Sequence, residues 1–134
     1  MFIFIAVVAS IASLYIAFGY WKAATFKATA SKQVMLDAGF SWLQNQPLAT
    51  ARVLAYLEFA GVIGVVLAPL AYLFGLDWAI FFAIAAAAGL SLVMLGAIIL
   101  HAMRKETKYT LKMNLKLLIP SLVATVAWAY LPLV

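Results

Sequence analysis

Four long apolar runs constrain the fold of this chain more than any other feature of its sequence. They cover residues 2–21, 51–74, 78–100 and 117–134, and their only charged residues are Arg52 and Glu58. An α-helix of about 20 residues crosses a hydrocarbon core of about 30 Å. Helices and closed barrels satisfy their backbone groups in lipid, and these runs are too long and too uniformly apolar for barrel strands. The sequence therefore predicts an all-α protein, a four-helix transmembrane bundle.

The composition agrees with a membrane location. Hydrophobic residues make up 69% and charged residues 10% of the 134 positions, against about half and about a quarter in soluble domains. The chain contains no cysteine, which excludes disulfides, thiol catalysis and cysteine-ligated zinc or iron–sulfur clusters. The net charge of +5 comes from basic residues between the apolar runs, so we interpret it as membrane anchoring and expect no nucleic-acid binding.

The chain is long enough for one domain, and we assign residues 1–134 to a single four-helix membrane domain. We expect its helices at about 2–21, 47–74, 78–100 and 115–133. The second helix begins near Pro47 because proline suits the first turn of a helix. Residues 31–44 mix apolar and polar side chains, which indicates a short amphipathic segment lying in the membrane interface. The first run has no basic residue before it and no clear cleavage site, so we interpret it as a mature helix.

Most of the positive charge lies in the two long links between these runs. Residues 22–50 contain three lysines and one aspartate, and residues 101–116 contain five lysine or arginine residues and one glutamate. Cytoplasmic loops of membrane proteins are enriched in Lys and Arg. We therefore predict a multi-pass protein of the plasma membrane, with both links on the cytoplasmic side and both termini on the outer side.

Glu58 lies about eleven residues beyond Pro47, or roughly 16 Å along the helix, which is too deep to reach the headgroups easily. An unpaired ionised carboxylate at that depth costs at least a few kcal/mol, so we expect the side chain to face the bundle interior, to be paired or to be protonated. The predicted orientation brings cationic residues from neighbouring helix ends into the same half of the membrane. We therefore predict a buried polar cluster of Lys22, Arg52, Glu58, His101 and Arg104.

Two interpretations of this cluster stay open. In one, it is a proton-active or anion-binding pocket for a quinone headgroup, a lipid phosphate or a small acid. In the other, Glu58 and a cation hold the helices together as a structural ion pair, and His101 is a polar end-cap. A single histidine excludes bis-histidine haem within one chain, and the sequence contains no HExxH motif or glycine-rich phosphate loop. We predict no catalytic residues and no metal site, and we do not expect an autonomous enzyme.

Three stretches of the sequence carry a recognisable pattern. They are AFGYWKAATF at the end of the first run, AGFSWLQNQPLATARVLAYLEFAGVIGVVLAPL around the second, and GLSLVMLGAIILHAMRKE at the end of the third. Together they resemble the DoxX-like family of small four-helix integral membrane proteins. The positions that match the family pattern are Lys22, Arg52, Glu58, His101, Arg104 and Glu106. The sequence departs from that pattern in a longer, more basic first link and in Tyr56, where relatives often have a small residue.

The resemblance implies a membrane accessory or anchor subunit. DoxX-like proteins include the small membrane subunit of a thiosulfate:quinone oxidoreductase and membrane partners in oxidative-stress complexes. We therefore expect a subunit of a redox, quinone-linked complex, with no covalently bound cofactor and with quinone or lipid as candidate ligands. The expected partners are the lipid bilayer and either another protein or further copies of this chain. The alternative is a quinone-, lipid- or small-molecule-binding protein, or a small oligomeric transporter, that uses Glu58 and His101.

Overall fold

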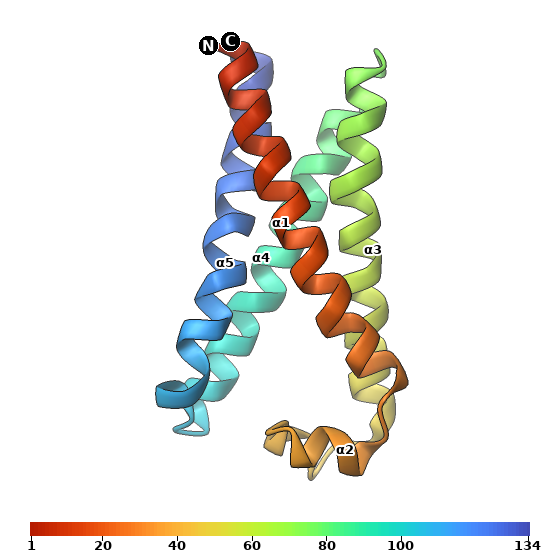
Figure 1. Ribbon diagram of the computed structural model, residues 1–134, viewed down its shortest axis with the longest axis vertical. Helices are drawn as coiled ribbons and strands as arrows, with labels where there is room; N and C mark the ends of the chain where they lie inside the picture. Colours follow the sequence, from red (N-terminus) through yellow and green to blue (C-terminus); the bar gives the residue numbers. More distant parts are fainter.

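The computed structural model describes residues 1–134, with the exception of the side chain of Tyr109. Four long helices make up most of the protein, and each is long and apolar enough to cross a membrane (Figure 1). They are α1 (Phe2–Thr29), α3 (Leu48–Leu73), α4 (Ala79–Met103) and α5 (Thr107–Tyr130). The prediction of an all-α protein with four helices able to span a membrane is confirmed.

The chain also contains a fifth helix, the short α2 (Lys32–Asp37), in addition to the four predicted spanning helices. The 3-10 helices η1 (Ser41–Leu43) and η2 (Leu131–Leu133) are single turns. The side chain of Ser31 accepts a hydrogen bond from the Val34 N–H and so caps the start of α2. Gly39, with a φ of 100°, allows the chain to reverse after it. Thus α2 and η1 occupy the segment 31–44, for which we predicted an amphipathic structure.

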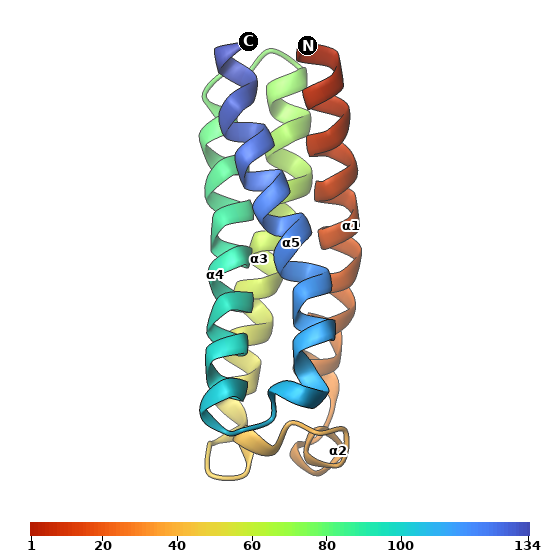
Figure 2. The same cartoon turned by 90° about the vertical axis from the view of Figure 1, so that its left-hand side faces the viewer.

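The long helices run alternately up and down, and each packs against two others. The contacts join α1 to α3 and α5, and they join α4 to the same two helices. Both chain termini lie at one end of the molecule, while α2 and the turn between α4 and α5 lie at the opposite end (Figures 1 and 2). We call this second end the basic end, because it carries Lys32, Arg104, Lys105 and Lys108.

Two long helices extend further than their apolar runs. Helix α1 continues to Thr29, beyond the predicted end at residue 21, and α5 begins at Thr107 rather than near residue 115. Both extensions contain lysines, which is why they fall outside the apolar runs. Lysine is nevertheless a good helix former, so it does not end a helix. Each extension also keeps a buried face, on which Ala24 and Lys27 of α1 and Asn114 of α5 lie. Packing therefore prolongs the helices beyond the residues that must cross lipid.

Two glycines allow α3 and α4 to approach each other closely. A Cβ atom added to Gly61 would lie 2.5 Å from the Leu90 side chain, and one added to Gly64 would lie 2.6 Å from the Ala86 Cβ. Small residues of this kind let helix backbones approach in lipid, where dispersion contacts drive association. The resulting core continues between α1, α4 and α5, where the Tyr20 hydroxyl donates a 2.7 Å hydrogen bond to the Leu90 carbonyl oxygen.

Candidate functional site

A buried ion pair joins α1 to α3. The Nζ atom of Lys27 lies 2.9 Å from each carboxylate oxygen of Glu58, and it donates a hydrogen bond to Oε1. The two residues are only 8% and 3% exposed. Side chains of a helix lean towards its N-terminus, so the Lys27 side chain leans from the basic end into the core and the Glu58 side chain leans towards the basic end. The antiparallel arrangement of α1 and α3 therefore brings the two groups together.

Arg52 lies in the first turns of α3 and binds the end of α1. Its Nη1 atom donates a 2.6 Å hydrogen bond to the Lys27 carbonyl oxygen, and its Nη2 atom donates a 2.9 Å bond to the Ala30 carbonyl oxygen. The last carbonyl groups of a helix lack partners within the helix and carry partial negative charge. The guanidinium satisfies two acceptors there, so it fixes the point at which α1 ends beside α3.

Two buried polar atoms of side chains lack a hydrogen-bond partner within the part of the chain that the structure describes. They are Glu58 Oε2 and Asn114 Nδ2. The short Lys27–Oε2 distance makes an ion pair, but only the bond to Oε1 has hydrogen-bond geometry. The charge of Oε2 is therefore neutralised by Lys27, but this oxygen can still accept a hydrogen bond. Both atoms belong to the half of the core nearer the basic end, and one is an acceptor while the other is a donor.

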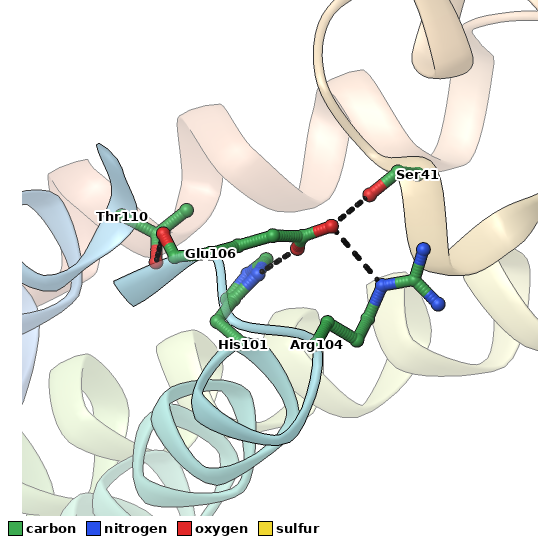
Figure 3. Close-up of polar contacts among 5 residues, drawn as sticks. All are labelled: Ser41, His101, Arg104, Glu106 and Thr110. Carbon is green, nitrogen blue, oxygen red and sulfur yellow. Dashed lines mark hydrogen bonds and ion pairs between the residues drawn. The ribbon is translucent and has the colours of Figure 1, made fainter. Parts of the chain in front are cut away.

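A second polar group lies at the basic end, centred on Glu106 between α4 and α5 (Figure 3). The carboxylate accepts a 2.5 Å hydrogen bond from the Ser41 hydroxyl and a 3.1 Å bond from Arg104 Nε. His101 Nδ1 lies 2.9 Å from its other oxygen, and the Thr110 hydroxyl donates to the Glu106 backbone carbonyl. Glu106 therefore connects the segment that contains η1 to the end of α4 and the start of α5.

The contacts of Glu106 stabilise its ionised form. The hydrogen bond from Ser41 has the largest effect, followed by the one from His101, and with Arg104 they lower the pKa of Glu106 from 4.5 to about 2. The carboxylate is therefore charged throughout the physiological pH range. Because Ser41 and His101 come from segments far apart in the sequence, this charge holds the link between α1 and α3 against the α4–α5 turn.

The five residues predicted as one cluster do not form one. Glu58 is buried, but its partner is Lys27, while Lys22 is exposed on α1 and is not part of the cluster. Arg52 contacts backbone carbonyls rather than the carboxylate. His101 and Arg104 belong to the second group, around Glu106. The prediction of a single buried cluster is therefore corrected to two groups, one in the core and one at the basic end.

Lys27 is the residue that the sequence reasoning missed. The prediction ended the first helix at residue 21, so it treated Lys27 as part of a loop. A helical pattern gives the signal, because Ile16, Tyr20 and Lys27 are four and seven residues apart and fall on one face. All three are buried. A lysine that continues a buried helical face predicts a carboxylate partner, and Glu58 is the only acidic residue in the apolar runs.

The described residues offer no ready metal site. Among the side chains that the structure describes, no group of three or more His, Asp or Glu residues comes together. Two cavities, of about 430 and 370 Å³, lie along α1 and α5, and their walls contain neither Glu58 nor His101.

Four apolar helices, each long enough to cross a membrane, with an ion pair buried between two of them, define a multi-pass integral membrane protein. Comparison with protein families gives the same result in more detail. The chain matches the DoxX-like family over residues 11–130, and it belongs to this family. No curated protein and no solved structure gave a significant match. The family resemblance seen in the sequence is therefore confirmed over nearly the whole chain.

Proposed function

We propose that this chain is an accessory or anchor subunit of a partner complex in the membrane, and that the complex is of the quinone-linked redox kind implied by the DoxX-like resemblance. The observation that carries the proposal is that the buried charged side chains bind other parts of the chain. Lys27 and Glu58 neutralise each other, and Arg52 binds the end of α1. These contacts stabilise the arrangement of the helices themselves. A rigid membrane body of this kind suits an anchor better than a catalyst.

The basic end is the face that we assign to the partner. Arg104, Lys105 and Lys108 are exposed there, and Glu106, which lies between them in the sequence, is already engaged by hydrogen bonds. The chain carries nine Lys and Arg residues against four Asp and Glu residues. An acidic protein surface is the complementary partner, because opposite potentials favour association and orient the encounter.

Site-directed photocrosslinking in native membranes tests this proposal. A photoreactive amino acid at Lys105 should yield a discrete crosslinked protein, whose identity mass spectrometry gives, and the complex should survive purification in mild detergent. The control position is Asp77, in the turn at the opposite end. Equal crosslinking at both positions, or purification of the chain alone with no redox protein attached, would contradict the anchor role.

A second candidate function is the binding of a small polar molecule in the core, and one observation favours it. Glu58 Oε2 and Asn114 Nδ2 are a buried acceptor and a buried donor without hydrogen-bond partners in the described part of the chain. A quinone headgroup or small acid bound in this half of the core would find a hydrogen-bond partner in such a group. Extraction of the purified protein and analysis of its bound small molecules tests this candidate. Loss of a co-purifying molecule in Asn114→Leu, with the fold retained, would favour it over the anchor role.

The transporter alternative has a separate test. Purified chain reconstituted alone in liposomes should show no flux of small acids above that of protein-free liposomes if the protein is an anchor. Flux that disappears in Glu58→Gln, while the protein remains folded and inserted, would instead favour transport.

A further inference from the structure

An apolar groove runs along the outer seam between α1 and α5. It consists of two adjoining cavities, of about 430 and 370 Å³, which share Val8 and Val123 in their walls. The first extends towards the termini, to Phe4 and Tyr130, and the second extends towards the basic end, to Tyr15 and Ile119. Every side chain that lines the groove comes from α1 or α5. The seam is therefore a continuous depression on the surface that faces lipid.

The helical spacing places lysines on the same two faces, beyond the end of the groove nearer the basic end. On α1, Val8, Tyr15 and Lys22 are successively seven residues apart, and on α5, Lys116 lies seven residues before Val123. Residues seven apart lie on one face of a helix, because two turns contain about seven residues. Both lysines are exposed. The groove thus ends at one cation from each helix.

The two lysines also lie at a similar depth. A Cβ atom added to Gly19 would collide with the Leu117 side chain, so these two residues face each other across the seam. Lys22 follows Gly19 by three residues, or about 4.5 Å, and Lys116 precedes Leu117 by one residue, or about 1.5 Å, both towards the basic end. Lys112 is also exposed, and it lies one turn nearer the basic end than Lys116 on the same face of α5.

No acidic residue of either helix can neutralise these cations. Neither α1 nor α5 contains an Asp or a Glu, and Glu58, which contacts α1 from α3, is buried and paired with Lys27. A lysine on a lipid-facing helix places its ammonium group at the headgroup level. The Lys112 and Lys116 side chains lean towards the basic end because α5 begins there. The positive charge at the seam therefore has no acidic partner on α1 or α5, and an anionic headgroup of the membrane complements it.

We propose that the α1–α5 seam is a binding site for an anionic phospholipid. Its phosphate lies between Lys22 and Lys116, with Lys112 beside it, and one acyl chain lies in the groove along Tyr15, Ile119 and Val123. The distance from Lys22 to Val8 is about 21 Å along the helix. One leaflet is half of a hydrocarbon core of about 30 Å, so an acyl chain that starts near Lys22 ends before Val8. Such a chain fills the cavity nearer the basic end. The site is independent of the partner face proposed above.

Lipid titration of the full chain in detergent, read by native mass spectrometry, tests this site. The probes are phosphatidylglycerol and phosphatidylcholine with the same acyl chains. The expected result is preferential binding of phosphatidylglycerol. Lys22→Gln/Lys116→Gln should weaken that binding about 25-fold, because each cation near an anionic surface contributes a factor of about five. Lys22→Arg/Lys116→Arg should retain it.

Two matched controls separate a specific site from general attraction. Arg104→Gln/Lys105→Gln removes two exposed charges of the α4–α5 turn, outside the seam, and should leave the binding unchanged. Val123→Trp fills the part shared by both cavities and should reduce binding, whereas Leu92→Trp on the exposed face of α4 should not. Equal binding of the two lipids, or equal losses in the seam variant Lys22→Gln/Lys116→Gln and the turn variant Arg104→Gln/Lys105→Gln, would overturn the proposal. Circular dichroism and a single gel-filtration peak establish that each variant is folded.

Discussion

The Lys27 ammonium group lies 2.9 Å from both carboxylate oxygens of Glu58, in a region of the core where neither residue is more than 8% exposed. The pair connects the last turns of α1 to the middle of α3. Arg52 reinforces the same junction by binding the carbonyl oxygen of Lys27 itself. Thus one lysine is held through its side chain by one residue of α3 and through its backbone by another.

Breaking this pair on one side should destabilise the protein strongly. Glu58→Gln leaves the Lys27 ammonium group buried without a counter-charge, and removal of one partner of a buried ion pair costs about 3–5 kcal/mol. The free energy of unfolding in mixed detergent micelles, followed by tryptophan fluorescence during titration with sodium dodecyl sulfate, should fall by this amount. An unchanged unfolding curve would show that the ion pair contributes nothing to the fold.

Removing both charges should restore most of that loss. In Lys27→Met/Glu58→Gln no charge remains buried, so the cost of one unpaired buried charge, the largest part of the loss, disappears. A double-mutant cycle that includes Lys27→Met measures the coupling between the two residues. If the double variant is as unstable as the sum of the two single variants, the residues do not act as a pair.

The Arg52 contacts predict that lysine is not an adequate replacement. Arg52→Lys keeps the charge but cannot reach two carbonyl oxygens with the fixed geometry of a guanidinium. We expect a loss of about 1.5–3 kcal/mol in the free energy of unfolding, the usual value for one hydrogen bond to a charged group. Lys32→Arg, at another cation that binds backbone carbonyls, is the matched control and should change little. A similar stability of Arg52→Lys and the parent protein would contradict this role.

The sequence could predict the four spanning helices because lipid imposes length and composition together. It could not place the ends of α1 and α5, since outside the hydrocarbon core nothing requires a helix to be apolar. The extension of α1 to Thr29 depends on tertiary contacts, namely the burial of Ala24 and Lys27 against neighbouring helices. The same holds for α2, which is stabilised by its Ser31 cap and by packing of Met35 on Leu43.

The candidate site was predictable only in part, for the same reason. Glu58 was recognisable as a buried residue from its depth in an apolar run. The predicted cluster includes Lys22 and omits Lys27, the true partner of Glu58, because the first helix is predicted to end at residue 21. The separation of His101 from Glu58 was not visible either, because Glu106 pairs with His101 across a turn containing Lys105 at a φ of 59°. Local turn geometry of this kind leaves little trace in the sequence.

The close approach of α3 and α4 predicts opposite effects for two glycine substitutions. Gly61→Ala places a Cβ atom 2.5 Å from the Leu90 side chain, and overpacking of this kind costs about 1–3 kcal/mol. Gly89→Ala meets nothing within 4 Å and should be neutral or stabilising by up to about 1 kcal/mol, because alanine favours the helix. The same unfolding titration with sodium dodecyl sulfate measures both changes in the free energy of unfolding. Equal effects at the two positions would be inconsistent with this packing.

The pKa of Glu106 predicts a loosening of the basic end in acid. A carboxyl group whose folded-state pKa lies near 2 contributes stability above pH about 4.5, and the contribution is lost as the pH falls towards 2. A fluorophore attached at Ala38→Cys, beside the segment that contains Ser41, should therefore change its emission in this range. Glu106→Gln should already show the acid form at neutral pH. Asp77→Asn, at the other end, should leave the transition in place, and its disappearance in that variant would exclude Glu106 as its origin.

The distribution of charge predicts the membrane orientation, and this prediction can be tested directly, since the chain has no cysteine to give background. Lys105→Cys lies at the basic end, and Asp77→Cys lies in the turn between α3 and α4 at the opposite end. If basic segments remain in the cytoplasm, a membrane-impermeant maleimide should label Asp77→Cys in intact cells, and it should label Lys105→Cys only after permeabilisation. Reversed labelling would place Arg104, Lys108 and the proposed partner face outside the cell, where the excess of positive charge would have no anionic cytoplasmic leaflet to contact.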